Sequence, residues 1–162
     1  MSDSRDELPD LSGAHLWLIF MKSYHAVREV DAESISASGL CLSDFAILEL
    51  LLHKGPLPVN AIGRKIMLTS GSITTAIDRL EKKRFVRRQA SPNDRRVTLV
   101  QLTASGRKLI GKIFKVHAAR LEKAFEPLSP PERAVLETLL KKVGKHCETL
   151  LRPEKTEGGF LS

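Results

Sequence analysis

Apolar residues recur every three or four positions along most of the chain, which is the spacing of amphipathic helices. No proline interrupts the first such stretch, and polar, glycine and proline residues separate the later ones. The pattern predicts six helices: about residues 11–33, 44–54, 59–66 and 70–83, a fifth from 104 to the proline at 127, and a sixth at 130–151.

Four of the predicted helices begin after a residue that can cap them. Ser43, Thr69 and Thr103 carry hydroxyls that can accept a hydrogen bond from the first helical turn. Ser129 is followed by two prolines and Glu132, which is the pattern of a capping box. Asp44 is expected at the positive end of its helix dipole, where a carboxylate is favoured.

The period changes once, between the fourth and fifth helices. Val86–Ala90 and Arg96–Leu102 alternate in polarity like strands, with Thr98, Val100 and Leu102 on one face. Between them lies Ser-Pro-Asn-Asp-Arg, which is typical of a turn. We therefore expect a β-hairpin with a basic tip.

Length and composition indicate one globular unit of 162 residues, with 42% apolar and 28% charged residues. The longest apolar run, Leu16–Met21, is far too short for a membrane helix. The N-terminus is acidic and polar, so we expect no export signal and a cytoplasmic protein. The two cysteines and five scattered histidines form no metal-ligand pattern, so no cofactor is expected.

Basic residues are concentrated in the middle of the chain. The whole chain has a net charge of +7, but residues 64–120 hold 15 Lys and Arg against three acids, a net of +12. Such a concentration is suited to a polyanion, because each neutralised phosphate releases counterions.

The predicted helix at 70–83 has the composition of a DNA-reading helix. Ile73, Ile77 and Leu80 share one face. The opposite face presents small or hydroxylated residues near its start and cations further along, and these are Gly71, Ser72, Thr75, Arg79 and Lys82. Small residues allow close approach to a groove, Thr can contact a base, and Arg can bind guanine or phosphate. With the preceding short helix this predicts a helix-turn-helix, and the hairpin makes it winged. Arg95 and Arg96 at the hairpin tip could enter a minor groove.

The stretch from Leu68 to Gly106 resembles the core of the multiple-antibiotic-resistance regulator (MarR) family. The resemblance depends on the Ser/Thr-rich start of the helix, on Asp78-Arg79-Leu80-Glu81, on the Asp94-Arg95-Arg96 wing, and on Leu102-Thr103 followed by Gly106. The surrounding helices match in order, so the resemblance covers about residues 10–150. It implies a mainly α fold with a small β-hairpin. A winged helix-turn-helix domain at 40–103 is flanked by dimerisation helices at 11–33 and 104–151, and the tail at 152–162 is expected to be flexible.

By this resemblance the chain is a homodimeric transcriptional regulator, commonly a repressor, that binds a double-stranded DNA operator. Asp94 is implied to orient the wing and Arg96 to enter the minor groove. Recognition-helix positions are matched by Ser72, Thr74, Thr75 and Arg79, and Ser70 is a further candidate DNA-binding residue. Family members usually have glycine where this chain has Arg84, so we expect either a strained left-handed residue or another cap geometry there. Arg84 could then contact phosphate. Thr75 stands where many members carry arginine, so the family's base preferences do not transfer directly.

The resemblance also implies a small, often aromatic effector that binds among the first, second and fifth helices. Candidate lining residues are Trp17, Met21, Tyr24, Phe45 and Phe114. Three alternatives remain open. They are a thiol-based redox sensor using Cys41, near a helix N-terminus, a non-specific architectural DNA binder, and a protein–protein adaptor on a winged-helix scaffold. Cys147 falls on the apolar stripe of the last helix and is expected to be inert core. No nucleotide-binding or hydrolase motif is present, so an enzyme is not expected.

Overall fold

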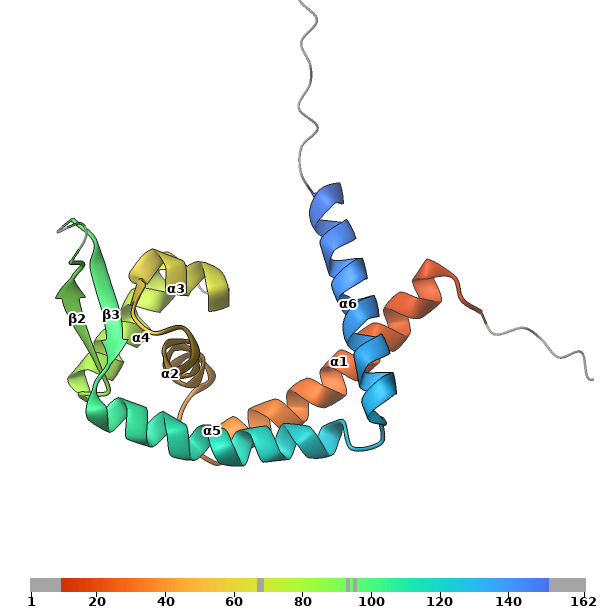
Figure 1. Cartoon of the computed structure of the whole chain (residues 1–162), viewed down its shortest axis with the longest axis horizontal. Helices are drawn as coiled ribbons and strands as arrows, with labels where there is room; N and C mark the ends of the chain where they lie inside the picture. The colour runs from red at the N-terminus through yellow and green to blue at the C-terminus, as the bar shows by residue number, and fades with distance from the viewer. Residues whose placement is uncertain (1–9, 67–68, 93, 95, 152–162) are drawn as a thin grey trace, which may run out of the picture. The chain divides into compact units, whose positions relative to one another are not determined.

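The computed structural model describes residues 10–66, 69–92, 94 and 96–151. They divide between two compact units, one ending at Ala124 and the other beginning at Phe125. Within these residues the elements follow in the order shown by the labels and colours of Figure 1: α1 Gly13–Ser36, α2 Leu42–Lys54, β1 Leu57–Pro58, α3 Val59–Ile66, α4 Ser70–Lys82, β2 Val86–Ala90, β3 Thr98–Leu102, α5 Ala104–Ala124 and α6 Pro130–Leu150.

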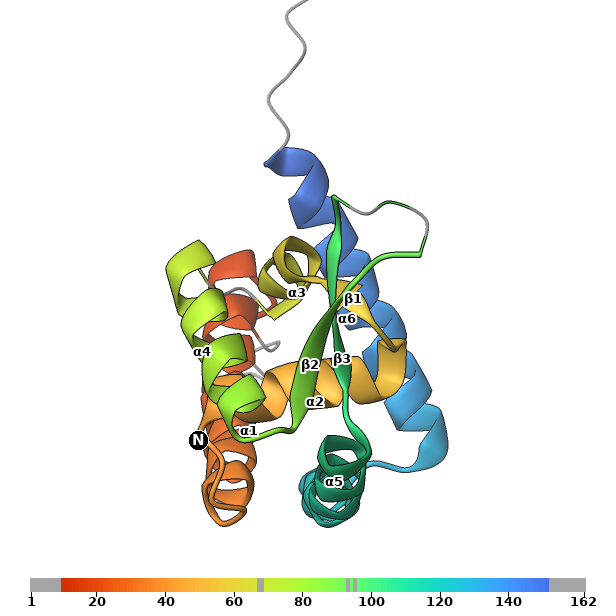
Figure 2. The ribbon, with the colours of Figure 1, turned by 90° about the vertical axis from the view of Figure 1, so that its left-hand side faces the viewer.

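The sheet is small and antiparallel, with β3 between β1 and β2. In the predicted hairpin, Val86 pairs with Leu102 and Ala90 with Thr98. β1 was not predicted, and its Leu57 pairs with Val100 on the other edge of β3. Figure 2 shows α2 crossing behind the β2–β3 hairpin, with α4 to one side. The predicted β-hairpin is therefore confirmed.

The hydrophobic core is built around α2, which is buried along most of its length. Branched apolar side chains from α3, α4, α5 and both long strands complete the core, and α4 supplies the three that were predicted for its buried face. The largest fully buried apolar side chains are Phe45, Ile47, Leu48, Leu51, Ile62, Ile73, Ile77, Leu80, Val86, Val100 and Ile110. Close packing of this kind fixes the orientation of α4 on α2.

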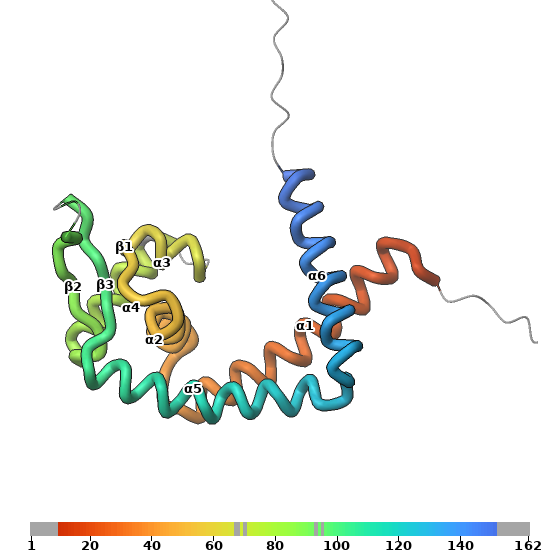
Figure 3. The backbone as a smooth tube through the Cα atoms, in the orientation of Figure 1, coloured from red at the N-terminus to blue at the C-terminus, as the bar shows by residue number. Residues whose placement is uncertain are grey.

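The fourth helix, the wing and the fifth helix meet at a tight junction. Figure 3 follows the chain from β3 directly into α5. Thr103 caps α5 as predicted, because its Oγ1 accepts a hydrogen bond of 3.0 Å from the backbone N–H of Gly106. The same hydroxyl lies 2.7 Å from the Arg84 carbonyl oxygen and donates to it. A Cβ on Gly106 would lie only 1.9 Å from the carbonyl oxygen of Phe85, so glycine is required at this position.

Helix α1 packs against α5 through polar contacts that the sequence did not indicate. His117 is 4% exposed, with Nε2 3.4 Å from Asp31 Oδ1 and Nδ1 3.3 Å from Ser34 Oγ. One turn further along α5, Arg120 pairs with Glu33 at 2.6 Å. These contacts explain why α1 runs to Ser36, three residues beyond the predicted end, and buries Ile35.

Helix α6 belongs to the second unit and begins with the predicted capping box. The Glu132 carboxylate accepts hydrogen bonds from the backbone N–H of Ser129, at 2.8 Å, and from its hydroxyl, at 2.6 Å. These bonds lower the pKa of Glu132. None of the residues of α6 is buried in the described chain, so the expectation that Cys147 is core is wrong for the single chain, where this thiol is exposed.

Further element boundaries also differ from the prediction. Helix α2 starts at Leu42, two residues before the predicted start at Asp44. Its N-cap position is Cys41, without a side-chain cap, so the assignment of Ser43 as cap is wrong. Strand β3 starts at Thr98 rather than Arg96, because residues before Thr98 still belong to the turn, in which Val97 N–H donates to the Asp94 carbonyl. No described helix has both the length and the apolar character needed to cross a membrane.

Candidate nucleic-acid interface

The start of α4 presents an exposed polar face, as predicted. Thr69 caps the helix and accepts from Ser72 N–H at 3.4 Å, while its hydroxyl donates to Ser72 Oγ at 2.8 Å. Thr75 donates to the Gly71 carbonyl at 3.1 Å. Ser72, Thr74 and Thr75 are exposed, and Ser70 occupies the first position of the helix. The helix therefore holds short hydroxyl side chains outward while Ile73 and Ile77 anchor it inward.

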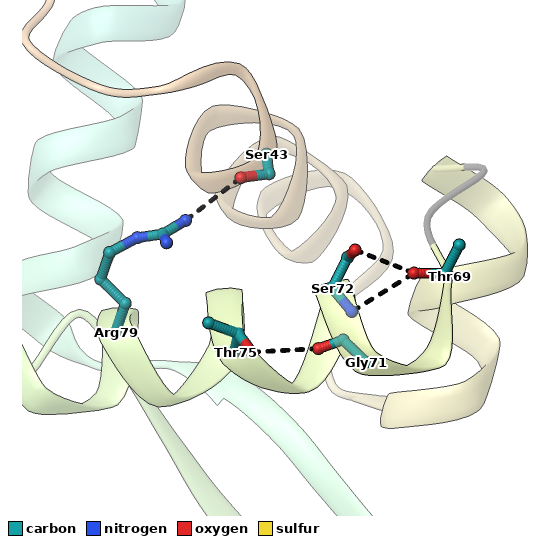
Figure 4. A pocket seen from close by; sticks show the side chains of 6 residues that line it. All are labelled: Ser43, Thr69, Gly71, Ser72, Thr75 and Arg79. Atoms are coloured by element: carbon teal, nitrogen blue, oxygen red, sulfur yellow. Dashed lines mark hydrogen bonds between the residues drawn. The ribbon is translucent and has the colours of Figure 1, made fainter.

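An open pocket of about 670 Å³ lies between this face and the start of α2. Figure 4 shows hydroxyls directed into it from both helices and Arg79 reaching across toward Ser43. The residues that line it are Ser43, Thr69, Gly71, Ser72, Thr75 and Arg79. Four of these residues carry hydroxyls, one is a cation and none is acidic, which suits a polyanionic surface.

The structure turns Arg79 toward α2. Its Nε donates to both oxygens of Asp44, at 3.0 and 3.1 Å, and its Nη2 lies 2.5 Å from Oδ1. The Asp44 side chain is 1% exposed, whereas that of Arg79 is 39% exposed. The hydrogen bond to Asp44 raises the pKa of Arg79 above its ordinary value. Asp44 lies in the first turn of α2, as predicted, but its main partner is an arginine 35 residues away.

Both acidic residues of α4 pair with one arginine of the wing. Arg88 on β2 donates its backbone N–H to Glu81 at 3.0 Å, and its guanidinium contacts both Glu81 and Asp78, the latter at 2.6 Å. A single guanidinium offsets one of the two negative charges, so Asp78, Glu81 and Arg88 together keep a net charge of −1. One signal for this pairing is available in the sequence: Asp78 and Glu81 are three residues apart and therefore share a helix face.

At the wing, Asp94 organises the turn and Arg96 extends from it. Asp94 Oδ1 accepts the Arg96 backbone N–H at 2.9 Å and lies 3.4 Å from its Nε. The Arg96 side chain is nevertheless 93% exposed. The predicted contact residue Arg95 lies outside the described residues. Asp94 and Arg96 thus have the geometry expected of a turn-forming residue and a reaching cation.

Arg84 adopts the left-handed conformation, which is the first of the two alternatives expected for it. Its φ is 59°, and among the described non-glycine residues it alone has a positive φ. Its carbonyl accepts from Thr103 and Ser105, and its side chain is exposed just after α4. The exposed position leaves Arg84 available as an additional cation near the recognition helix.

The five predicted effector residues are only partly brought together. Phe45 and Phe114 both lie beside the ring of His117, with centroid distances of 4.7 and 6.3 Å. Met21 is half-buried on α1, while Trp17 and Tyr24 are more than half exposed on the same helix. His117 itself was missed, because a histidine on an apolar helix face gives no specific signal.

Cys41 is exposed at the start of α2, and its Sγ lies 3.3 Å from Arg79 Nη2. Both cysteines are free thiols. Within the described part of the chain, no three His, Cys, Asp or Glu side chains gather as metal ligands.

Comparison with known proteins identifies the fold and its role. The family model for the MarR family matches residues 40–98. The chain is 42% identical over 133 residues to the HTH-type transcriptional regulator MhqR of Bacillus subtilis, covering 82% of this chain and 92% of MhqR. The chain belongs to the MarR family. It is therefore a DNA-binding transcriptional regulator, and its relatives are named as regulators, not enzymes.

Solved MarR-family structures share the architecture. AbsC of Streptomyces coelicolor superposes with a TM-score of 0.75 at 21% identity, over 88% of this chain and 99% of that one. A cysteine-to-serine mutant of MarR from E. coli, crystallised with operator DNA, gives a TM-score of 0.68 at 25% identity, over 83% and 99%. The predicted mainly α, winged-helix fold is thus confirmed.

Proposed function

We propose that this MarR-family chain is a repressor that binds a pseudo-palindromic operator as a homodimer. The observation that carries the proposal is the exposed hydroxyl face of α4, where Ser72 and Thr75 project from a helix anchored in the core. In this proposal α4 enters the major groove and Arg96 of the wing enters the adjacent minor groove. The crystallised complex of the E. coli relative with operator DNA supports this use of the fold.

Large apolar surfaces support the homodimer. Helix α1 exposes Leu16, Trp17 and Phe20 by about half their area. Helix α6, considered separately, exposes Leu139, Leu140 and further apolar side chains in the same way. Exposed apolar faces of this extent are usually covered by a partner, and a second copy closes them with two-fold symmetry.

Release from DNA by a small aromatic ligand is the finer part of the proposal. It is supported by the rings of Phe45, Phe114 and His117, which meet where α1, α2 and α5 converge. A ligand acts there only if it prefers the conformation that binds DNA less well. The hypothesis of redox sensing through Cys41 stays a prediction, tested by comparing peroxide-treated wild type with a Cys41→Ser variant.

The deciding experiment is a binding titration with DNA from upstream of the chain's own gene against random duplex at physiological salt. A specific regulator should prefer its operator by about 10³-fold or more. Footprinting should then show two half-sites about one helical turn apart. Equal affinity for both duplexes would indicate an architectural binder instead, and protection of a single half-site would contradict the two-fold arrangement.

A further inference from the structure

The contact between α4 and α2 includes an ion pair with a buried carboxylate as well as apolar packing. Asp44 is enclosed in the core of the DNA-binding domain, and both of its carboxylate oxygens accept hydrogen bonds from Arg79. Lys83, at the C-cap of α4, approaches the same carboxylate at 3.5 Å. A buried carboxylate without its partner is strongly unfavourable. The pair therefore favours the position of α4 on α2 in which Arg79 contacts Asp44.

Because of the position of Arg79 on α4, its contact with Asp44 depends on how the exposed face of α4 is oriented. Thr75 and Arg79 are four residues apart, so they lie on the same side of the helix. A rotation or slide of α4 that moved Thr75 would also move the guanidinium away from Asp44. The planar fork of arginine tolerates little displacement, because its N–H groups match the carboxylate in one orientation.

The donors of Arg79 that face α2 are already engaged. Besides Asp44, Nη2 lies 3.2 Å from Ser43 Oγ and 3.3 Å from Cys41 Sγ. One guanidinium therefore donates hydrogen bonds to three side chains at the N-cap and in the first turn of α2. A base or phosphate contact through Nε or Nη2 would have to break this arrangement and leave Asp44 buried without its main partner.

We propose that Arg79 is a positioning residue whose pairing with Asp44 sets the register of the recognition helix on DNA. This differs from the direct base or phosphate contact expected from the sequence. It rests on the proposed function, since it assigns how the operator-reading face of α4 is held, and it places operator specificity partly on a residue of α2 that touches no DNA.

The test uses the full-length protein and three variants: Asp44→Asn, Arg79→Gln and the two combined. Operator and random-duplex affinities are measured across a range of salt concentrations. Each variant should lose roughly tenfold of the operator preference, the size of one lost base contact. The double variant should lose no more than either single variant. The salt slope should stay unchanged, because a phosphate contact would contribute about 0.9 to it and Arg79 makes none.

A second measurement separates positioning from a general loss of stability. Thr75→Ala is introduced into both wild type and Asp44→Asn, and thermal melts confirm that all variants are folded at the assay temperature. If α4 has lost its register, Thr75→Ala should reduce operator affinity much less in the Asp44→Asn background. Lys112→Gln, at an exposed lysine of α5, serves as the matched loss of one positive charge and should leave the preference unchanged.

If Asp44→Asn is unfolded at the assay temperature, Arg79→Lys replaces it. This variant keeps the positive charge but lacks the planar guanidinium, and it should lose the operator preference to the same extent. The inference is overturned if Arg79→Gln lowers the salt slope by about one phosphate while Asp44→Asn does not. It is also overturned if the two effects add, or if the variants keep the preference of the wild type. A wild type with no operator preference would overturn the proposed function and, with it, this inference.

Discussion

At the scale of single residues, the junction of α4, the wing and α5 imposes the strictest requirements. Phe85 O, which accepts the Thr103 backbone N–H at 3.0 Å, occupies the space where a side chain at Gly106 would begin. This gives a physical reason for glycine three residues after the capping threonine in the family pattern.

Replacing Gly106 with alanine should lower the free energy of unfolding by about 1–3 kcal/mol, because backbone atoms must shift to admit the new methyl group. Denaturant unfolding measures this. A methyl group on Gly111 in the same helix would meet nothing within 4 Å, so Gly111→Ala should instead stabilise by up to about 1 kcal/mol through helix propensity. Equal effects at the two glycines would contradict the close approach.

Arg84 is the opposite case to Gly106, because its backbone conformation would be less strained if the residue were glycine. Arg84→Gly should raise the free energy of unfolding by about 1 kcal/mol, since the left-handed conformation at φ 59° no longer meets a Cβ. Lys82→Gly, in regular α4 geometry, should lower it by a similar amount. The pair is compared by urea titration, and a loss of stability in Arg84→Gly would show that the residue is not strained.

Residue-scale predictions from the sequence succeeded where the interaction is local. The caps at Thr69, Thr103 and Ser129 depend on neighbours within three residues, and all are present. The pairing of Asp44 with Arg79 spans 35 residues, and nothing in the sequence near either residue indicates it. Ser43 failed as a cap because it lies inside the first turn of α2, where its hydroxyl faces Arg79.

At the scale of elements, periodicity predicted the long helices and the hairpin but not the shortest strand. β1 has two residues, one of them proline, and it exists only because Val100 and Leu99 offer a partner edge. A strand this short has no period of its own to detect. The wing, by contrast, combines alternation with a turn sequence, and both signals are local.

The wing also allows the sharpest element-scale prediction. Arg96→Ala should weaken operator binding by roughly 1–3 kcal/mol, because the exposed guanidinium is proposed to enter the minor groove. Fluorescence anisotropy with labelled operator measures the affinity, and sedimentation should show the same oligomer as wild type. Unchanged affinity would remove the wing tip from the proposed DNA contact.

At the scale of the whole molecule, the apolar stripes of α1 and α6 were visible in the sequence as helical periodicity. What the stripes could not indicate is which surface covers them, because a stripe against its own domain and one against a second chain have the same pattern. Considered by itself, α6 exposes the apolar side chains of Leu139, Leu140 and Val143.

Leu140→Asp should therefore dissociate the proposed homodimer, because it would place a charge in an apolar interface. Analytical ultracentrifugation at micromolar concentration should show a shift from dimer to monomer. Lys141→Asp, on the neighbouring exposed position, is the control and should leave the dimer intact. A dimer that persists in the Leu140→Asp variant would assign the α6 stripe to another contact.

The absence of a side chain at Gly106 has a mechanical consequence. The Phe85 carbonyl lies directly against the backbone of α5, and Thr103 is hydrogen-bonded to the carbonyls of both Arg84 and Phe85. The base of the wing is therefore held rigidly against the first turn of α5. A small tilt of α5 would thus rotate the hairpin with it, and the displacement would increase from the base of the wing toward Arg96.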